Sequence, residues 1–230
     1  MREKGKPLPP SEPAPPLLEP ILHGPSHQTG RYLELFSPEY LPRTVMLSFF
    51  NVLWAICIFG YLNWMPILLM KQGLSITHSL GYTFVMTLAA PLGPLAIMPF
   101  ADKIERKWQI AGSALTIAAI GIVFAITRNP YIMIPVGALQ VLFGAIFAYS
   151  FQTYQAELFP TRIRTQGIGF VYSWSRLSAI LGGFVIAHVM REYGASAVFI
   201  LLSASMLLVV FIITLFGPLT NNKSLETLSP

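Results

Sequence analysis

Six apolar stretches, each about long enough to cross a lipid bilayer, constrain this chain more than any other feature of its sequence. They cover residues 45–70, 79–101, 110–127, 131–154, 167–190 and 195–216. A helix needs roughly 20 apolar residues to span the hydrocarbon core. Only 11% of the residues are charged, against about 25% in soluble domains. The sequence therefore predicts an all-α integral membrane protein with six transmembrane helices.

The chain divides into three parts by composition. Residues 1–44 hold ten of the 19 prolines, a density that opposes both helix formation and a packed core. We expect a Pro-rich cytosolic segment over 1–44, a six-helix membrane half-bundle over 45–217 and a cytosolic tail over 218–230. Within the first part, residues 32–36 are expected to form one amphipathic turn at the membrane surface.

The basic residues predict the orientation of the helices. If the amino terminus is cytosolic, the inside loops and tails carry eleven basic residues and the outside loops only three, which are Lys71, Arg128 and Arg191. The positive-inside rule then places both termini in the cytosol. The net charge of +5 is explained by these loops, so no nucleic-acid partner is expected. The predicted location is the plasma membrane, which is the inner membrane in a bacterium.

Reactive residues are scarce. Cys57 is the single cysteine, and the histidines at 23, 27, 78 and 188 share no ligand spacing on one helix. The sequence contains no Gly-rich phosphate loop and no G-x-S-x-G nucleophile motif. We therefore expect no disulfide, metal site or cofactor, and no enzymatic activity.

Arg176 is a charged residue near the middle of the fifth apolar stretch. A charge at this depth costs from about 2.5 to more than 10 kcal/mol and normally faces a bundle interior or an aqueous pathway. No acidic residue lies inside the other apolar stretches. The counter-charge is expected from a substrate carboxylate, from solvent, or from a carboxylate of protein outside this chain.

Two polar loops carry charged residues that we expect to form a cytosolic gate. Asp102 and Arg106 are four residues apart and share one face of a helix end. Glu157 is placed to pair with Arg162 or Arg164 of its own loop, or with the loop over 102–107. The expected gate residues are Glu157, Arg162, Arg164, Asp102, Arg106 and Lys107. The alternative is an ordinary basic loop, whose surface salt bridges contribute about 0–1 kcal/mol each.

Aromatic and amide side chains form a candidate substrate-binding wall beside Arg176. Asn51, Trp54 and Tyr61 lie in the first stretch, and Tyr149 and Gln152 lie in the fourth. Trp54 and Tyr61 are seven residues apart, which places them on one helix face. The alternative is that these aromatic residues face lipid or pack the bundle.

Three prolines in the second stretch, Pro91, Pro94 and Pro99, predict a curved and mobile helix. Prolines inside a membrane helix are tolerated where neighbouring groups satisfy the freed backbone. Gly182-Gly183 in the fifth stretch are explained equally well by close helix packing.

With these motifs the chain resembles the carboxy-terminal half of a major facilitator superfamily transporter. Residues 102–107 resemble the cytosolic D-x-x-G-R-[RK] loop, with Glu105 in place of the glycine. Residues 157–164, Glu-Leu-Phe-Pro-Thr-Arg-Ile-Arg, resemble the motif between helices ten and eleven of sugar porters, organic ion transporters and niacin-type symporters. Organic-anion and aromatic-acid members of the superfamily often carry an arginine twelve positions after the last arginine of this motif, as Arg176 follows Arg164. The run from Phe59 to Pro66 also resembles the seventh helix of these members.

The resemblance implies secondary active transport of a small organic acid by alternating access, coupled to protons, with a sugar as the alternative substrate. Such carriers have two six-helix halves with the site between them, and this chain corresponds to one half. Three possibilities stay open: a piece of a complete carrier, a half-carrier that pairs with a second copy, or a truncated membrane protein or scaffold without transport activity. The implied partners are the anionic substrate, a proton, the bilayer and the missing amino-terminal half.

Overall fold

The computed structural model describes residues 32–71, 73–101, 103–127 and 129–220, and within them all regular structure is helical. Most of the expected Pro-rich segment, and Asp102 of the expected gate, lie outside the described residues. In chain order the elements are η1 (Tyr32–Phe36), α2 (Leu41–Lys71), α3 (Ile76–Thr87), α4 (Leu92–Ile97), η2 (Met98–Phe100), α5 (Arg106–Ile126), α6 (Pro130–Leu158) and α7 (Arg164–Phe216).

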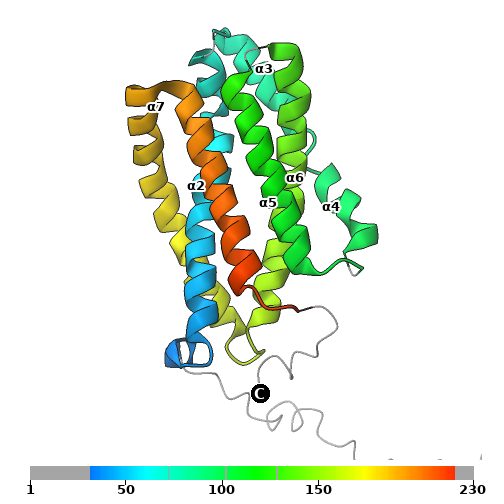
Figure 1. Ribbon diagram of the computed structural model, residues 1–230, viewed down its shortest axis with the longest axis vertical. Coiled ribbons are helices and arrows are strands. Elements are labelled where there is room, and N and C mark those ends of the chain that lie inside the picture. The colour runs from blue at the N-terminus through cyan, green and yellow to red at the C-terminus, as the bar shows by residue number, and fades with distance from the viewer. Residues whose placement is uncertain (1–31, 72, 102, 128, 221–230) are drawn as a thin grey trace, which may run out of the picture.

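Six passes across the membrane are confirmed, although the described residues form only five continuous helical segments that are long and apolar enough to cross a membrane. The difference lies in α7, whose 53 residues are interrupted at Gly194. Gly194 has φ 81° and ψ 179°, a backbone conformation that glycine adopts without steric penalty. The chain reverses there, so α7 consists of two antiparallel segments, 164–193 and 195–216 (Figure 1).

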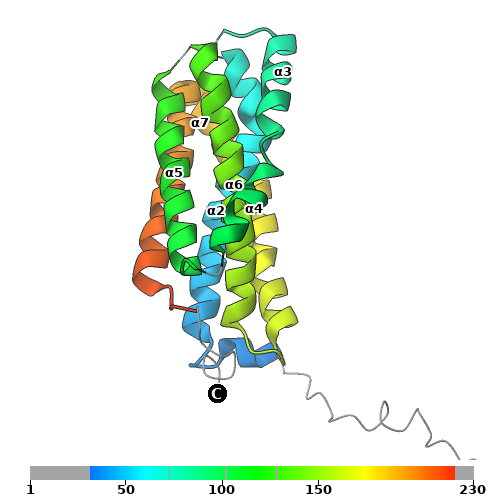
Figure 2. The ribbon, with the colours of Figure 1, turned by 90° about the vertical axis from the view of Figure 1, so that its right-hand side faces the viewer.

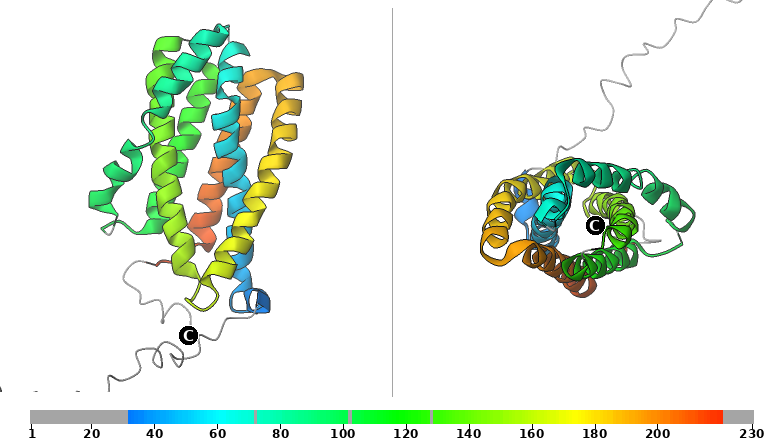
Figure 3. Two further views of the ribbon diagram at one scale, coloured as in Figure 1. Left: turned by 180° about the vertical axis from the view of Figure 1, so that it is seen from behind. Right: turned by 90° about the horizontal axis from the view of Figure 1, so that it is seen from above.

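The second span differs from the single curved helix that we predicted. The helix α3 ends at Thr87, a turn follows over 88–91, and the short α4 and η2 complete the crossing. Proline has no N–H to donate and clashes with the preceding turn, so Pro91, Pro94 and Pro99 divide the span rather than bend it. As a result α4 leaves the line of α3 (Figure 3).

The bundle presents two different faces. The helix α5 and the second segment of α7 lie on the side toward the viewer in Figure 1. The opposite side, seen from behind in Figure 3, shows α2, α3, α6 and the first segment of α7. Figure 2 shows the same bundle edge-on, with α4 in front of α6.

Stacked aromatic rings form much of the core between these two faces. Phe50 of α2 stacks on Phe151 and Phe147 of α6, with ring centroids 4.0 and 5.5 Å apart. Phe124 of α5 stacks on Phe199 of α7 at 5.2 Å. Offset and stacked aromatic pairs stabilise a core beyond the effect of their buried area. The core therefore ties α2 to α6 and α5 to α7.

Candidate functional site

The loop between α6 and α7 lies at the same end of the bundle as the starts of α2 and α5, and we call this the motif end. Glu157 Oε1 lies 2.5 Å from Arg106 Nε. Their side chains are only 22% and 13% exposed, so water screens this ion pair less than a surface pair. The contact joins the last turn of α6 to the first turn of α5.

The other residues beside Arg106 bind the end of α7. Lys107 Nζ donates to the carbonyl oxygen of Gly217 at 2.8 Å. The carboxylate of Glu105 accepts from the backbone N–H of Thr220 at 2.6 Å. The expected gate residue Lys107 is therefore a C-terminal cap of α7, a position where a cation is favoured.

Two expected gate arginines make their contacts around the α6–α7 loop. Arg162 Nε lies 3.5 Å from Glu34 Oε2 of η1. Arg164 donates to the carbonyl oxygen of Phe159 at 3.2 Å and to Thr161 Oγ1 at 3.3 Å. Of the expected gate contacts, the structure brings together Arg106 and Glu157.

A cavity of about 200 Å³ lies among α2, α3, α5 and α6. The half-buried Trp54 forms part of its wall, and its ring stacks on Phe147 with centroids 4.3 Å apart. Across the cavity, α6 contributes the small side chains of Gly144, Ala145 and Ala148. Gln152 is exposed and lies four residues beyond Ala148, so it extends the same helix face. The residues that line the cavity are therefore mostly apolar.

Two expected wall residues have mainly packing contacts. Asn51 is buried, and its Nδ2 donates to Gln155 Oε1 at 3.0 Å, which joins α2 to α6. Tyr61 contributes to the cavity lining, but its ring lies 6.2 Å from that of Phe199. A Cβ added to Gly121 would meet the Tyr61 hydroxyl, so this hydroxyl is directed toward α5.

Sequence reasoning missed Gln140 of α6, which lines the cavity. Its side chain is only 5% exposed, and its Oε1 has no hydrogen-bond partner among the described residues. An unsatisfied buried amide oxygen is costly. This oxygen is itself shielded from the cavity, so the Gln140 side chain would have to rotate to offer it to a ligand. The available signal was an amide in the middle of an apolar stretch.

Arg176 lies on the first segment of α7 and is exposed. Its Nη2 donates to the hydroxyl of Tyr172 at 2.6 Å, and its guanidinium carbon lies 4.8 Å from the centroid of the same ring. Tyr172, one turn earlier, was not among the predicted site residues. Among the described residues, no ion pair between Arg176 and an acidic side chain is found.

The helices of the bundle differ in their exposed side chains. Along α2, α3, α6 and the first segment of α7, exposed polar residues occur among exposed apolar ones. The polar residues are Asn63, Thr87, Tyr149, Gln152, Tyr172 and Arg176. Along α5 and the second segment of α7 the exposed residues include Leu115, Ile122, Ile200, Leu207, Leu208 and Phe211. The helices that carry the polar residues also expose large apolar ones, among them Phe84, Ile180 and Phe184. Of these exposed groups, the guanidinium of Arg176 is the one that requires protein or water in place of lipid.

Within the described residues, no group of three or more His, Cys, Asp or Glu side chains is arranged to hold a metal ion. The charged residues of the site are instead an isolated guanidinium at Arg176 and the ion pair at the motif end.

The profile of the Major Facilitator Superfamily matches residues 79–228. YyaJ of Bacillus subtilis is 27% identical over 213 residues, which are 93% of this chain and 47% of YyaJ. The inner membrane metabolite transport protein YdjE of Escherichia coli is 26% identical over 201 residues, 87% of this chain and 44% of YdjE. The niacin transporter NiaP of Acinetobacter baylyi is 27% identical over 218 residues, 93% of this chain and 49% of NiaP.

The chain thus spans about half the length of these relatives. The relatives are named as transport proteins and not as enzymes, in agreement with the non-enzymatic function predicted from the sequence. The apolar helices of this chain make it a multi-pass membrane protein, and the chain belongs to the Major Facilitator Superfamily.

Proposed function

We propose that this chain forms one half of a secondary active transporter that moves a small organic anion by alternating access. The substrate site would lie between this half and a second six-helix half, as in transporters built from structural repeats. Membership of the superfamily and the metabolite and niacin transport named for the relatives support this proposal. The membrane would be the plasma membrane, with both termini in the cytosol.

The observation that carries the proposal is the exposed position of Arg176 along a membrane-crossing helix. A guanidinium in contact with lipid at that depth would cost several kcal/mol. The face that bears Arg176 is therefore expected to border a water-filled cavity or another protein surface. A guanidinium presents a planar pair of N–H donors that matches a carboxylate, and it stays protonated when partly desolvated.

The cavity beside Trp54 supports the proposal that the transported anion carries an aromatic ring. The indole and the small residues of α6 offer a mostly apolar slot, and rotation of the Gln140 side chain would add one acceptor. A volume of about 200 Å³ is suited to a single ring rather than to a large ligand. An aromatic or heteroaromatic carboxylate would place its ring against Trp54 and its charge toward Arg176. Niacin, named for the relative NiaP, is one such acid.

The ion pair between Arg106 and Glu157 supports a conformational gate at the motif end. It joins α5 to α6 at the motif end, in addition to the packing of the two helices and the hydrogen bond from Ser150 Oγ to Gln109 Oε1. Its two partners are side chains at helix ends, so the pair can break and re-form when helices move. We propose that it stabilises the state in which the motif end is closed. Proton coupling is proposed from the resemblance to metabolite–proton symporters, and a protonophore should then abolish uptake.

Substitution of Arg176 in the complete carrier that contains this chain tests the proposed function. For an anion site, uptake of a radiolabelled aromatic acid should be lost in both Arg176→Ala and Arg176→Lys, because lysine keeps the charge but not the planar pair of donors. The exposed Arg191 of the α7 turn provides the control, and Arg191→Lys should leave uptake unchanged.

A structural ion pair between Arg176 and the second half predicts a different pattern. Uptake would then largely survive in Arg176→Lys, and neutralising the partner carboxylate would restore Arg176→Ala. Unimpaired uptake by Arg176→Ala would show that this arginine has neither role. A neutral sugar substrate would be indicated if the unaltered carrier took up a radiolabelled sugar and not the aromatic acid, and if Arg176→Ala left the sugar uptake unchanged.

A further inference from the structure

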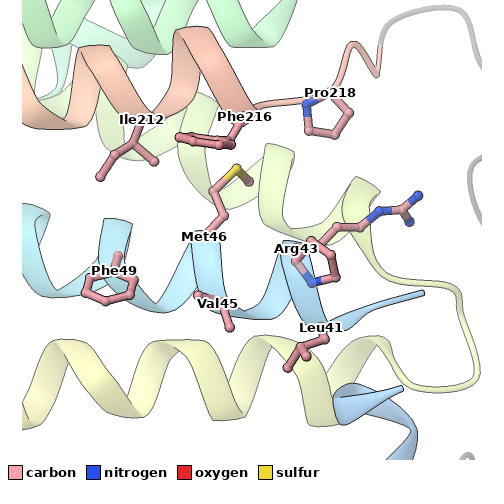
Figure 4. A pocket seen from close by; sticks show the side chains of 9 residues that line it. Leu41, Arg43, Val45, Met46, Phe49, Ile212, Phe216 and Pro218 are labelled. Atoms are coloured by element: carbon pink, nitrogen blue, oxygen red, sulfur yellow. The ribbon is translucent and has the colours of Figure 1, made fainter. Parts of the chain in front are cut away.

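A long apolar groove lies away from the proposed substrate site. It has a volume of about 630 Å³ and runs between α2 and the second segment of α7. Figure 4 shows Val45, Met46 and Phe49 along one side and Ile212 and Phe216 along the other. The stretch from residue 41 to residue 49 of α2 corresponds to about 12 Å of helix rise, so the groove can hold an extended hydrocarbon chain.

One basic side chain, that of Arg43, lies at one end of this groove. Arg43 lies beside Pro218 at the motif end, and its guanidinium points away from the apolar side chains (Figure 4). Its Nη1 donates to the carbonyl oxygen of Leu158 at 3.3 Å, which holds the charge at this position. Lys107 is not among the lining residues, and its Nζ donates to the carbonyl oxygen of Gly217 at 2.8 Å. The apolar groove therefore ends at a single guanidinium.

A second apolar groove, of about 330 Å³, lies on the other side of the same helix face. Leu41, Val45 and Phe49 line both grooves and form the ridge that separates them. Thr44 and Ser48 also line the second groove, but their hydroxyls donate to the backbone oxygens of Leu35 and Thr44. Both polar groups are satisfied, so the second groove presents apolar surface as well.

We propose that these grooves bind one anionic phospholipid, with its phosphate at Arg43 and its two acyl chains on either side of the Leu41–Val45–Phe49 ridge. Basic pockets between membrane helices at the cytosolic surface are known to suit acidic lipid headgroups. Arginine offers several N–H donors, of which the contact with Leu158 uses one. The lipid would be a structural ligand of the outer surface of the bundle, distinct from the transported substrate.

Photo-crosslinking of the purified 230-residue chain tests this site. The probe is a phosphatidylglycerol that carries a diazirine in one acyl chain, and labelled peptides are mapped by mass spectrometry. We expect labelling of Val45, Met46 and Phe216 at least five-fold above that of Leu115 and Ile122, which are exposed apolar residues of α5. Excess unlabelled phosphatidylglycerol should remove this labelling, whereas phosphatidylcholine should not.

Two variants separate the contributions of charge and shape. Arg43→Gln should lower groove labelling several-fold, while Arg191→Gln at the opposite end should not change it. Val45→Phe adds bulk to a side chain that is 44% exposed and should also reduce labelling without disturbing the core. Even labelling of the groove and of α5 would overturn the proposal. If both unlabelled lipids competed equally and Arg43→Gln had no effect on labelling, the proposed preference for an anionic headgroup would be wrong.

Discussion

At the scale of single residues, Trp54 lies between the aromatic core and the cavity because one face of its indole stacks on Phe147. If its other surface contacts the ring of the substrate, Trp54→Ala should raise the apparent KM for uptake about ten-fold, in line with about 1–3 kcal/mol for a lost stacked contact. Tyr149, which is exposed on α6, should show a smaller effect as Tyr149→Ala. The exposed Trp108 at the start of α5 is the control, and Trp108→Ala should leave KM unchanged. An unaltered KM in Trp54→Ala would assign this residue to packing.

Gln140 allows stability and binding to be separated. Its unsatisfied Oε1 destabilises the empty bundle by about 1–3 kcal/mol, so Gln140→Leu should keep or raise the melting temperature of the purified protein. If a substrate N–H or O–H donates to this oxygen, the same variant should weaken binding about five- to ten-fold, which corresponds to one hydrogen bond. A loss of both stability and binding would instead indicate a structural role for Gln140.

At the scale of secondary-structure elements, the position of α4 depends on Gly93. A Cβ at this residue would lie 2.6 Å from Ala145 Cβ and 2.7 Å from the carbonyl oxygen of Leu142. The backbone of α6 cannot move aside easily, so Gly93→Ala should destabilise the protein by about 1–3 kcal/mol through overpacking. Gly81 of α3 has no heavy atom within 4 Å of the added Cβ. Gly81→Ala should therefore be neutral in the same thermal-unfolding measurement.

The ion pair between α5 and α6 predicts a kinetic effect. Glu157→Gln removes the charge that holds Arg106, so the closed state of the proposed gate is destabilised. Uptake by the complete carrier should fall several-fold in maximal rate, while the apparent KM changes little. The exposed Arg191–Glu192 pair is the matched control, and Glu192→Gln should have no effect. An unchanged maximal rate in Glu157→Gln would remove the gating role.

At the scale of the whole molecule, the predicted orientation can be measured by cysteine labelling in intact cells. Cys57 is buried, so the background from the native cysteine should be low. Lys71→Cys, at the end of α2, should react with a membrane-impermeant maleimide from outside. Thr165→Cys, at the start of α7, should react only after the membrane is permeabilised. Both positions are exposed, and the reverse pattern would invert the topology.

The helices and loops show where sequence reasoning succeeds. The passes were predicted from apolar length, and the reversal at Gly194 follows from a glycine that the chain needs at positive φ. Glu157 was expected to contact one of several basic residues, and the structure selects Arg106. The second span was predicted incorrectly as one helix, because tolerance of proline depends on whether neighbouring helices satisfy the freed carbonyl groups.

Apolar length and the scarcity of charge determined by themselves that this chain crosses a membrane repeatedly, because a bilayer excludes charge and requires about 20 apolar residues for each helical pass. Only the tertiary structure decided which side of each helix is packed, because these helices are apolar around most of their circumference and lack a polar stripe that would mark the outside. Trp54 and Tyr61 share a helix face by spacing, yet Trp54 forms part of the cavity wall while the hydroxyl of Tyr61 lies against α5. Which neighbour each helix meets depends on contacts between residues far apart in the sequence.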